Sequence, residues 1–553
     1  MKATFKPLGL AIAVATASAG YAGIVNAQTL ADNAGLGNLA IVPYYTVNSG
    51  YTTGVSVINT SEFTQVVKVR MRRAVDSMDA LDFNVVLSPF DVWTGYVQQE
   101  AFDGEEFNEI RFYSNDKSCV VPDFTNENYF LMPNTFRVGA EEGYIEIMGM
   151  ASPTTEDQPI AISALHGPDG IPADCDRVRD NFFAGTTATD YYPTTAAALA
   201  STTRTRGVIN SAITWQRATD PATGAVLSPA TPVPSSYEAP DNVLKVSYFI
   251  KDDDTGIEFG NDAVHIADFL DGASMTNQER GINAGDLQGF DHPDLDGGAP
   301  TSAISGYADA ASVGSYEPLR DALGADQVIN DWSGAVNDLF TVDTDWVVTT
   351  PGQYLMTNQA GYIDSIEEAA EGGDPAGVAT GALKCLGGTL PADSPAGPNA
   401  YVASTGANCD FRDIPLTVTA TVWDREEREI DVTENELVVS PSPVIPPTIV
   451  NFDQEVNVIQ WGTEPVLDSV KNIIIPVPAG AESGWAEVDV VTTKTEVGIC
   501  EYTAFGALPL PTACAATSTP VPLVGFVAWQ RNFDATPAAN YGRIVEHSFA
   551  NED

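Results

Sequence analysis

Clustered acidic side chains are the strongest candidates for chemistry in this sequence. They lie in two short stretches: Asp252, Asp254 and Glu258, then Asp291, Asp294 and Asp296. Ca²⁺ takes six to eight hard oxygen ligands and tolerates the irregular geometry of such loops. The second stretch resembles part of an EF-hand loop, but His292 stands at the first ligand position and no glutamate stands at the twelfth. The two stretches are therefore predicted to be either calcium sites or solvated acidic loops.

Six cysteines form an even set. They are Cys119, Cys175, Cys385, Cys409, Cys500 and Cys514, and none belongs to a C-x-x-C pair. In an oxidising compartment such cysteines form structural disulfides. We expect sequential pairing, because Cys385 with Cys409 and Cys500 with Cys514 would each close a short loop.

Histidine is scarce and scattered, which argues against a recognisable active site. The four histidines are His166, His265, His292 and His547, without H-E-x-x-H or H-x-H spacing. The nucleophile motif G-x-S-x-G is missing as well. The 75 acidic residues allow so many carboxylate pairs that a glycoside hydrolase site can be neither located nor dismissed. We assign no catalytic residue, and an enzyme is the less favoured prediction.

Tryptophan side chains offer another kind of site, because exposed aromatic rings can stack on sugars. The candidates are Trp93, Trp332, Trp346, Trp461, Trp485 and Trp529. At alternating strand positions a tryptophan more often belongs to the core. Two or more of them on a concave surface beside two carboxyls would favour a polysaccharide-binding protein or hydrolase, whereas burial in separate cores would argue against it.

Four cations are concentrated in one short stretch, at Lys68, Arg70, Arg72 and Arg73. Val67, Val69 and Met71 alternate with them, which predicts a half-buried strand. These cations could receive an acidic neighbouring copy or an anionic glycan. The favoured alternative is cross-strand pairing with Asp79 and Asp82.

Charge excludes one class of partner. The 553 residues contain 26 basic and 75 acidic side chains, a net charge of −49. Nucleic acid is bound through clustered cations, so neither DNA nor RNA is an expected partner. The expected partners are cations, neutral surfaces, copies of this chain or a cell-surface glycan. After the first residues no segment approaches 18 consecutive apolar residues, so no transmembrane span is expected.

The first 27 residues have the pattern of a secretory signal peptide. Lys2 and Lys6 precede the apolar stretch Leu8–Gly20, and Val25–Ala27 matches a cleavage site. We therefore expect an exported protein, either extracellular at the cell surface or periplasmic. The expected regions are a signal peptide (1–27), an N-terminal β-sandwich domain with loop insertions (28–250), an acidic Gly-rich middle region (251–410), return strands (411–440) and a C-terminal β region (448–553).

Alternation of apolar and polar residues predicts a mainly β fold, with antiparallel β-sandwich domains, long irregular loops and a few short helices. The runs Leu39–Tyr45 and Thr52–Ile58 flank Asn48-Ser49-Gly50, which is typical of a hairpin turn. Ile160–Leu165 is expected as a strand. Short helices are expected near Ala263–Leu270 and Tyr316–Leu323.

Three segments resemble a large group of exported proteobacterial proteins that carry only a general description such as "cell surface protein". They are Leu39–Asn48, Leu81–Gly95 and Thr344–Thr349. The resemblance implies a surface-associated β protein and transfers no functional residue. Together with the composition, it predicts a non-enzymatic structural or association protein, dependent on calcium if the acidic stretches bind it. The alternative is a secreted polysaccharide-binding protein or glycoside hydrolase.

Overall fold

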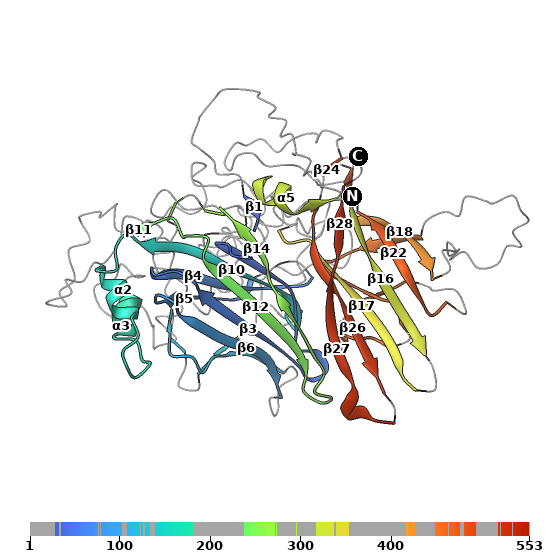
Figure 1. The fold of residues 1–553 in the computed structure, drawn as a ribbon, viewed down its shortest axis with the longest axis horizontal. Helices are drawn as coiled ribbons and strands as arrows, with labels where there is room; N and C mark the ends of the chain where they lie inside the picture. Colours follow the sequence, from blue (N-terminus) through green and yellow to red (C-terminus); the bar gives the residue numbers. More distant parts are fainter. Residues whose placement is uncertain are drawn as a thin grey trace, which may run out of the picture.

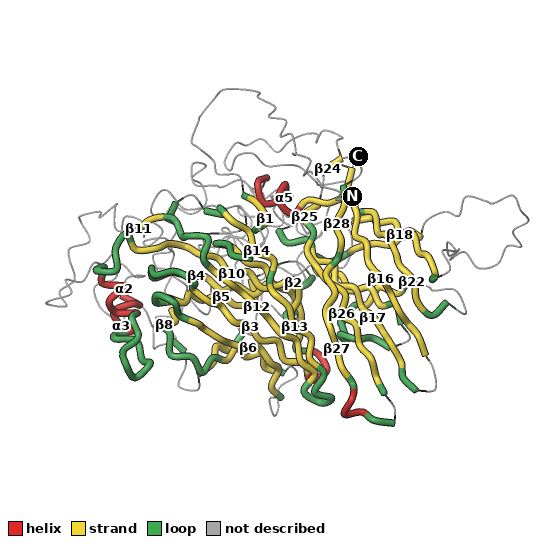
Figure 2. The backbone as a smooth tube through the Cα atoms, in the orientation of Figure 1, coloured by secondary structure: helices red, strands yellow, loops and turns green. Residues whose placement is uncertain are grey.

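The described part of the protein folds mainly as antiparallel β-sheet in the computed structural model (Figures 1 and 2). The structure describes residues 28–31, 35–75, 77, 79–101, 108–121, 123–124, 128–132, 139–180, 237–270, 272–273, 293, 295, 317–336, 339–352, 416–425, 448–462, 464–475, 481–490, 492–493, 518–519, 521–533 and 535–551. Within these residues the predicted fold class is confirmed, since strands dominate and the helices are few and short.

The first unit is a sandwich of two antiparallel sheets. The larger sheet has the order β1 (Thr29–Leu30), β14 (Val264–Ala267), β2 (Leu39–Thr46), β10 (Glu142–Pro153), β4 (Gln65–Arg73), β5 (Asp79–Leu87) and β8 (Cys119–Val121), with β11 (Tyr237–Glu238) paired to β10. The six-stranded sheet has the order β13 (Glu258–Asp262), β12 (Leu244–Asp252), β3 (Tyr51–Asn59), β6 (Val92–Glu100), β7 (Glu109–Tyr113) and β9 (Tyr129–Leu131).

Side-chain alternation places a core between these two sheets. In β4 the side chains of Val67, Val69 and Met71 face this core, as the period of two predicts. Phe83 of β5 crosses to the opposite sheet, where its ring centroid lies 5.7 Å from that of Trp93 in β6. Aromatic contact of this kind adds to the burial of apolar area and fixes the two sheets face to face.

The turn after β2 carries the chain between the sheets. Ser49 and Gly50 adopt positive φ angles of 49° and 85°, as turn residues of this type readily do. However, β2 pairs with β10 and β14, whereas β3 pairs with β12 and β6. The hairpin prediction was therefore wrong. The turn sequence specifies a local reversal, and burial of both faces of β2 decides which strands it pairs with.

The second unit is built on a ten-stranded sheet. Its main path is β19 (Thr448–Phe452), β18 (Leu416–Asp424), β22 (Ser483–Asp489), β16 (Gln327–Val336), β17 (Thr341–Thr349), β20 (Val456–Gln460) and β21 (Asn472–Ile474). Three strands branch from this path: β26 (Val524–Asn532) on β17, β27 (Tyr541–Glu546) on β26, and β28 (Ser548–Ala550) on β16. The sheet folds around a second core that includes Trp332, Trp346 and Trp461.

The two units share apolar packing. Val347, Val456 and Phe526 of the second unit belong to the core of the first. The hydroxyl of Thr349 donates to the backbone oxygen of Pro43 at 2.7 Å, and the hydroxyl of Tyr51 donates to the backbone oxygen of Val466 at 2.5 Å. The sandwich is therefore completed by residues that lie hundreds of positions later in the chain.

The remaining elements are short. They are η1 (Asn48–Gly50), α2 (Pro159–Ala164), α3 (Cys175–Asp180), α5 (Glu317–Leu323), β15 (Gly324–Ala325), β23 (Thr492–Thr493), β24 (Ser518–Thr519), β25 (Val521–Pro522) and η6 (Pro537–Ala539). The helix expected at Tyr316–Leu323 is confirmed as α5.

Two local predictions were wrong. The segment Ile160–Leu165 is α2 rather than a strand, and a proline in its first turn favours the helical start. The segment Ala263–Leu270 contains β14 rather than a helix. Its backbone pairs with β1 and β2, so pairing with neighbouring strands overrides local helix preference.

Candidate functional site

The outer face of the six-stranded sheet carries aromatic side chains that are half-buried or exposed. In β6 Trp93 and Val97 point into the sandwich core, so Tyr96 points outward. In β12 Val246 and Ile250 point inward, so Phe249, with 36% of its surface exposed, points outward. The strands therefore present one apolar face and one face that combines rings with small polar groups.

Strand register aligns these rings in a row across five strands. The successive partners in the row are Phe249, Gly54, Tyr96, Tyr113 and Tyr129. The rings of Tyr96 and Tyr113 stack at a centroid distance of 5.2 Å, and those of Tyr113 and Tyr129 lie 5.3 Å apart. Neighbouring strands are about 4.8 Å apart, so the aromatic row spans roughly 19 Å.

Gly54 is the one position of the aromatic row without a side chain. A Cβ atom there would lie 2.2 Å from Cε1 of Phe249, which is closer than real Cβ atoms approach. The glycine therefore allows the Phe249 ring to lie over β3. This placement directs the ring toward Tyr96 on the next strand.

A row of hydroxyl groups runs beside the aromatic row. Ser247 of β12, Ser56 of β3 and Thr94 of β6 are successive register partners. Together with Phe249, Tyr96 and the exposed Asn115 they line a groove of about 290 Å³. Within the described residues, the three hydroxyls have no hydrogen-bond partner in the protein. They are therefore free to bind solvent or a ligand.

Charges near the groove are paired with one another. Lys245 Nζ lies 2.6 Å from Asp262 Oδ2. Arg111, whose guanidinium covers the Tyr129 ring at 4.5 Å, lies 2.5 Å from Glu109 through Nη2 and Oε2. Burial raises the pKa of Tyr113, so its phenol stays neutral. The groove thus offers aromatic faces and neutral hydrogen-bonding groups, and the nearby Lys245 and Arg111 are both paired with carboxylates.

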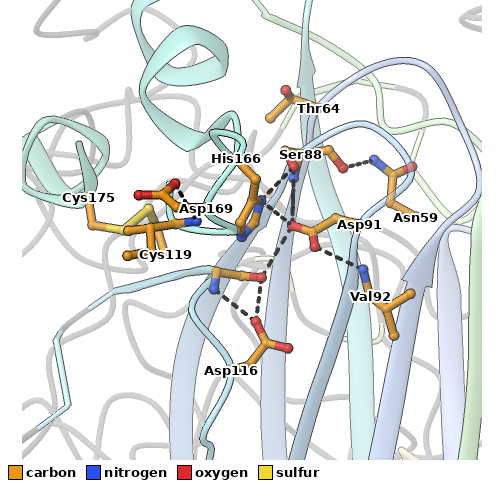
Figure 3. Close-up of polar contacts among 12 residues, drawn as sticks. Asn59, Thr64, Ser88, Asp91, Val92, Asp116, Cys119, His166, Asp169 and Cys175 are labelled. Carbon is orange, nitrogen blue, oxygen red and sulfur yellow. Dashed lines mark hydrogen bonds and ion pairs between the residues drawn. A yellow bond between two sulfur atoms is a disulfide. The ribbon is translucent and has the colours of Figure 1, made fainter. Parts of the chain in front are cut away.

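A serine, a histidine and an aspartate meet at one end of the sandwich (Figure 3). Ser88 Oγ lies 3.0 Å from Nδ1 of His166, and Asp91 Oδ2 lies 3.6 Å from the same nitrogen. In a catalytic triad the serine and the carboxylate contact different nitrogens of the imidazole, so that the ring can carry a proton between them. Because both partners meet one nitrogen here, this cluster lacks the geometry of such a relay.

The same cluster holds three loops together. Asp91 Oδ2 accepts hydrogen bonds from the backbone amide of Ser88 at 3.1 Å and from the Ser118 hydroxyl at 3.2 Å. The neighbouring disulfide joins Cys119 of β8 to Cys175 of α3 (Figure 3). The arrangement therefore anchors the segment containing α2 and α3 to the sandwich.

Of the predicted calcium ligands, only the first group lies in the described residues. Asp252 Oδ1 accepts hydrogen bonds from the backbone amides of Asp254 and Thr255, at 2.9 and 3.2 Å, in the turn between β12 and β13. Glu258 is exposed on β13. Asp291, Asp294 and Asp296 lie outside the described residues. In the described part no group of three or more His, Cys, Asp or Glu side chains could hold a metal ion. Calcium binding stays a prediction.

The cysteines and tryptophans can be placed in part. The expected pair Cys119–Cys175 is confirmed, while Cys385, Cys409, Cys500 and Cys514 lie outside the described residues. Five of the six tryptophans put forward as sugar-binding candidates are buried: Trp93, Trp332, Trp346, Trp461 and Trp529. Trp485 is 39% exposed but stacks on Trp423 at a centroid distance of 3.9 Å. The groove rings are instead tyrosine and phenylalanine, which the sequence analysis did not single out.

The cationic strand β4 is wholly buried rather than half-buried. Arg70 Nε lies 3.1 Å from Asp82 Oδ1, so this expected cross-strand pair is confirmed. Arg72 Nε lies 2.5 Å from Oε1 of Glu146 on β10, a partner that the sequence analysis missed because pairing between β4 and β10 spans distant segments. These buried ion pairs belong to the interior of the protein.

Comparison of the chain with protein-family models, with curated proteins and with solved structures finds no match. Among the residues that the structure covers, none of the helices has the length and apolar character needed to cross a membrane.

Proposed function

We propose that this chain is an exported association protein of the cell surface that binds a neutral glycan in the groove between Phe249 and Tyr96. The observation that carries the proposal is the pair of parallel rows, one of aromatic rings and one of hydroxyls that have no hydrogen-bond partner among the described residues. The signal-peptide pattern and the resemblance to exported surface proteins support the location.

Sugar rings match this arrangement chemically. Their apolar C–H faces can pack on aromatic rings, while their hydroxyls exchange hydrogen bonds with Ser56, Thr94 and Ser247. A site of few polar groups among apolar walls is the usual form of a small-molecule pocket. The net charge of −49 and the pairing of Arg111 with Glu109 disfavour an anionic ligand. Binding rather than catalysis is proposed because the Ser88 cluster has no relay geometry.

The test is affinity electrophoresis of residues 28–553 in gels that contain neutral soluble glucans, mannans or galactans, with a polyuronate gel for comparison. We expect retardation by at least one neutral polysaccharide. Tyr96→Ala and Phe249→Ala should each weaken binding about fivefold or more, since an aromatic contact contributes on the order of 1 kcal/mol. Trp485→Ala, which removes an exposed ring from the second unit, is the matched control.

Two results would contradict the proposal. The first is that no neutral polysaccharide retards the wild-type protein. The second is that Trp485→Ala abolishes retardation while Tyr96→Ala and Phe249→Ala leave it unchanged, which would place the sugar-binding surface on the second unit.

A further inference from the structure

Two arginines and three aromatic rings form a compact patch on the second unit, here called the arginine–aromatic patch. Its members are Trp529 and Arg531 of β26, Tyr541 and Arg543 of β27, and Phe340. Register pairs Trp529 with Arg543 and Arg531 with Tyr541, so the arginines and rings alternate in a checkerboard on one face of the hairpin. Figure 1 shows this hairpin in red at the lower edge of the second unit.

The guanidinium groups are held by rings. The Arg531 guanidinium lies 4.5 Å from the Phe340 ring centroid, 5.0 Å from that of Trp529 and 5.8 Å from that of Tyr541. The Arg543 guanidinium lies 4.4 Å from the Trp529 centroid. Cation–π contact fixes the orientation of these groups without neutralising their charge.

Neither Arg531 nor Arg543 has an ion pair with a carboxylate in the part of the chain that the structure describes. This is unexpected in a protein with 75 acidic and 26 basic side chains. Arg70, Arg111 and Arg179 each have a carboxylate within hydrogen-bonding distance. Among the described residues, the two arginines of the patch therefore lie together without a carboxylate partner.

The patch is accessible along β27, whereas Trp529 is buried and Arg531 is half-buried. Tyr541 has 42% of its surface exposed, and Arg543 is exposed beside it. A guanidinium presents several N–H groups in a planar fork that matches a carboxylate, and it loses little hydration when it stacks on a ring. Two such forks supported by aromatic rings therefore suit a partner that brings closely spaced carboxylates.

We propose that the arginine–aromatic patch docks a carboxylate-rich surface of a second copy of this chain. Charge complementarity selects this partner, because each copy has 75 acidic side chains and a net charge of −49. Asp253 and Asp254 are exposed next to each other in the turn between β12 and β13, and Asp253 also pairs with Lys251, so carboxylates stand close together on the surface. A contact between two different surfaces of one chain is heterologous, so it generates rings or open filaments.

The test is the oligomeric state of residues 28–553, measured by sedimentation velocity across a protein concentration series at 0.15 M NaCl. At this ionic strength the screening length is about 8 Å, so repulsion between whole molecules is reduced while close contacts persist. The double variant Arg531→Gln/Arg543→Gln is compared with Arg425→Gln, an exposed arginine that donates to the Ser483 hydroxyl. Melting temperatures of all three proteins check that the variants fold.

We expect the wild-type protein and Arg425→Gln to form oligomers as the protein concentration rises. The double variant should need at least a tenfold higher concentration to reach the same degree of association. Added polyglutamate should dissociate the wild-type assembly. The proposal fails if the wild-type protein remains a monomer, if the double variant associates as readily, or if the patch binds a polyuronate while the chain stays monomeric. Neutral polysaccharide should retard the double variant as much as the wild-type protein. The self-association proposal can therefore fail independently of the glycan-binding proposal.

Discussion

Asp345 of β17 accepts a hydrogen bond from the backbone amide of Leu467 at 2.9 Å, although its carboxyl is fully buried. The amide of Val466 donates to the same oxygen at 2.8 Å. From the first unit, Glu142 accepts from the amide of Val470 at 3.2 Å and from the hydroxyl of Ser469 at 3.1 Å. One carboxyl from each unit therefore holds the segment between β20 and β21.

Stability should fall as the pH rises toward neutrality because of Asp345. Burial is the main cause that raises the pKa of Asp345 from 3.8 to about 7, and the nearby carboxylates of Asp343 and Asp468 contribute to the rise. The two hydrogen bonds from backbone amides lower the pKa and oppose this effect only in part. The folded state thus keeps a proton that the unfolded state releases between pH 4 and pH 7. At about 1.4 kcal/mol for each pKa unit, the loss across this window is about 4 kcal/mol. Asp345→Asn should remove it, as urea midpoints at pH 5 and pH 8 will show.

The control for this variant is Asp453→Asn, which changes an exposed carboxylate paired with Lys471. It should leave the difference between pH 5 and pH 8 unchanged. An Asp345→Asn protein with the same pH dependence as the wild type would show that Asp345 does not titrate in this range.

Two buried histidines should act in the opposite direction. Burial lowers the pKa of His265 and of His547 from 6.5 to about 4, so the unfolded state takes up protons first as the pH falls from 6.5 to 4. Each histidine should cost about 3 kcal/mol across that window. In the wild-type protein Asp345 offsets part of this loss. We therefore expect His547→Gln in the Asp345→Asn background to be more resistant to acid than Asp345→Asn alone, measured by urea midpoints at pH 4.5 and pH 6.5. If the two proteins resist acid equally, the lowered pKa of His547 is not a source of acid sensitivity.

Gly54→Ala should weaken glycan binding with little loss of stability. The new Cβ atom would meet the end of the Phe249 ring, a flexible side chain that can move aside and disturb the groove. We expect a several-fold loss of retardation and a change in unfolding free energy of about 1 kcal/mol or less. Gly272→Ala, where a Cβ atom would meet nothing within 4 Å, is the control. If Gly54→Ala binds glycan as well as the wild-type protein does, the Phe249 ring is not part of the glycan-binding surface.

The Ser88 cluster should be structural. Asp91→Asn replaces one of two accepting oxygens with an NH₂ group, so either the hydrogen bonds from Ser88 and Ser118 or the one from the amide of Val92 is lost. We expect the free energy of unfolding to fall by about 2 kcal/mol, measured by thermal unfolding. Ser88→Ala should lower the stability less, because the hydrogen bond from the backbone amide of residue 88 to Asp91 remains. Hydrolysis of p-nitrophenyl acetate by Ser88→Ala should equal that of the wild-type protein. Esterase activity lost in Ser88→Ala would contradict a purely structural role.

The disulfide Cys119–Cys175 should stabilise the first unit, since it closes a loop with a sequence separation of 56 residues. In the chain-entropy model a loop of this size contributes about 4 kcal/mol. Cys119→Ala/Cys175→Ala should lower the urea midpoint accordingly. Any further decrease in the stability of the variant on addition of dithiothreitol would report the contribution of disulfides among the other four cysteines. A variant as stable as the oxidised wild type would show that loop closure adds nothing here.

The sequence predicts strands and their inward faces well, because a period of two is a local property. Val67, Val69 and Met71 face the core as expected, and the pair Arg70–Asp82 follows from neighbouring strands. What it could not predict is register between distant strands. The aromatic row joins Phe249 to Tyr96 through Gly54, and no local pattern indicates that these three positions are neighbours.

The choice of tryptophan as the sugar-binding ring failed for a related reason. Trp93 and Tyr96 lie close together on one strand, but an odd spacing of three positions places them on opposite faces. The larger ring fills the core and the smaller one remains outside. A search for outward aromatic residues at odd spacing from buried ones would have identified Tyr96 from the sequence.

The shared core also determines when the protein can finish folding. Val347, Val456 and Phe526 complete the interior of a sandwich whose own strands are already present by residue 267. A chain that emerges with its N-terminus first therefore exposes an apolar face of the sandwich until the last quarter of the chain has followed. During that interval the nascent protein resembles an aggregation-prone intermediate, and a holding chaperone would have a defined surface to cover.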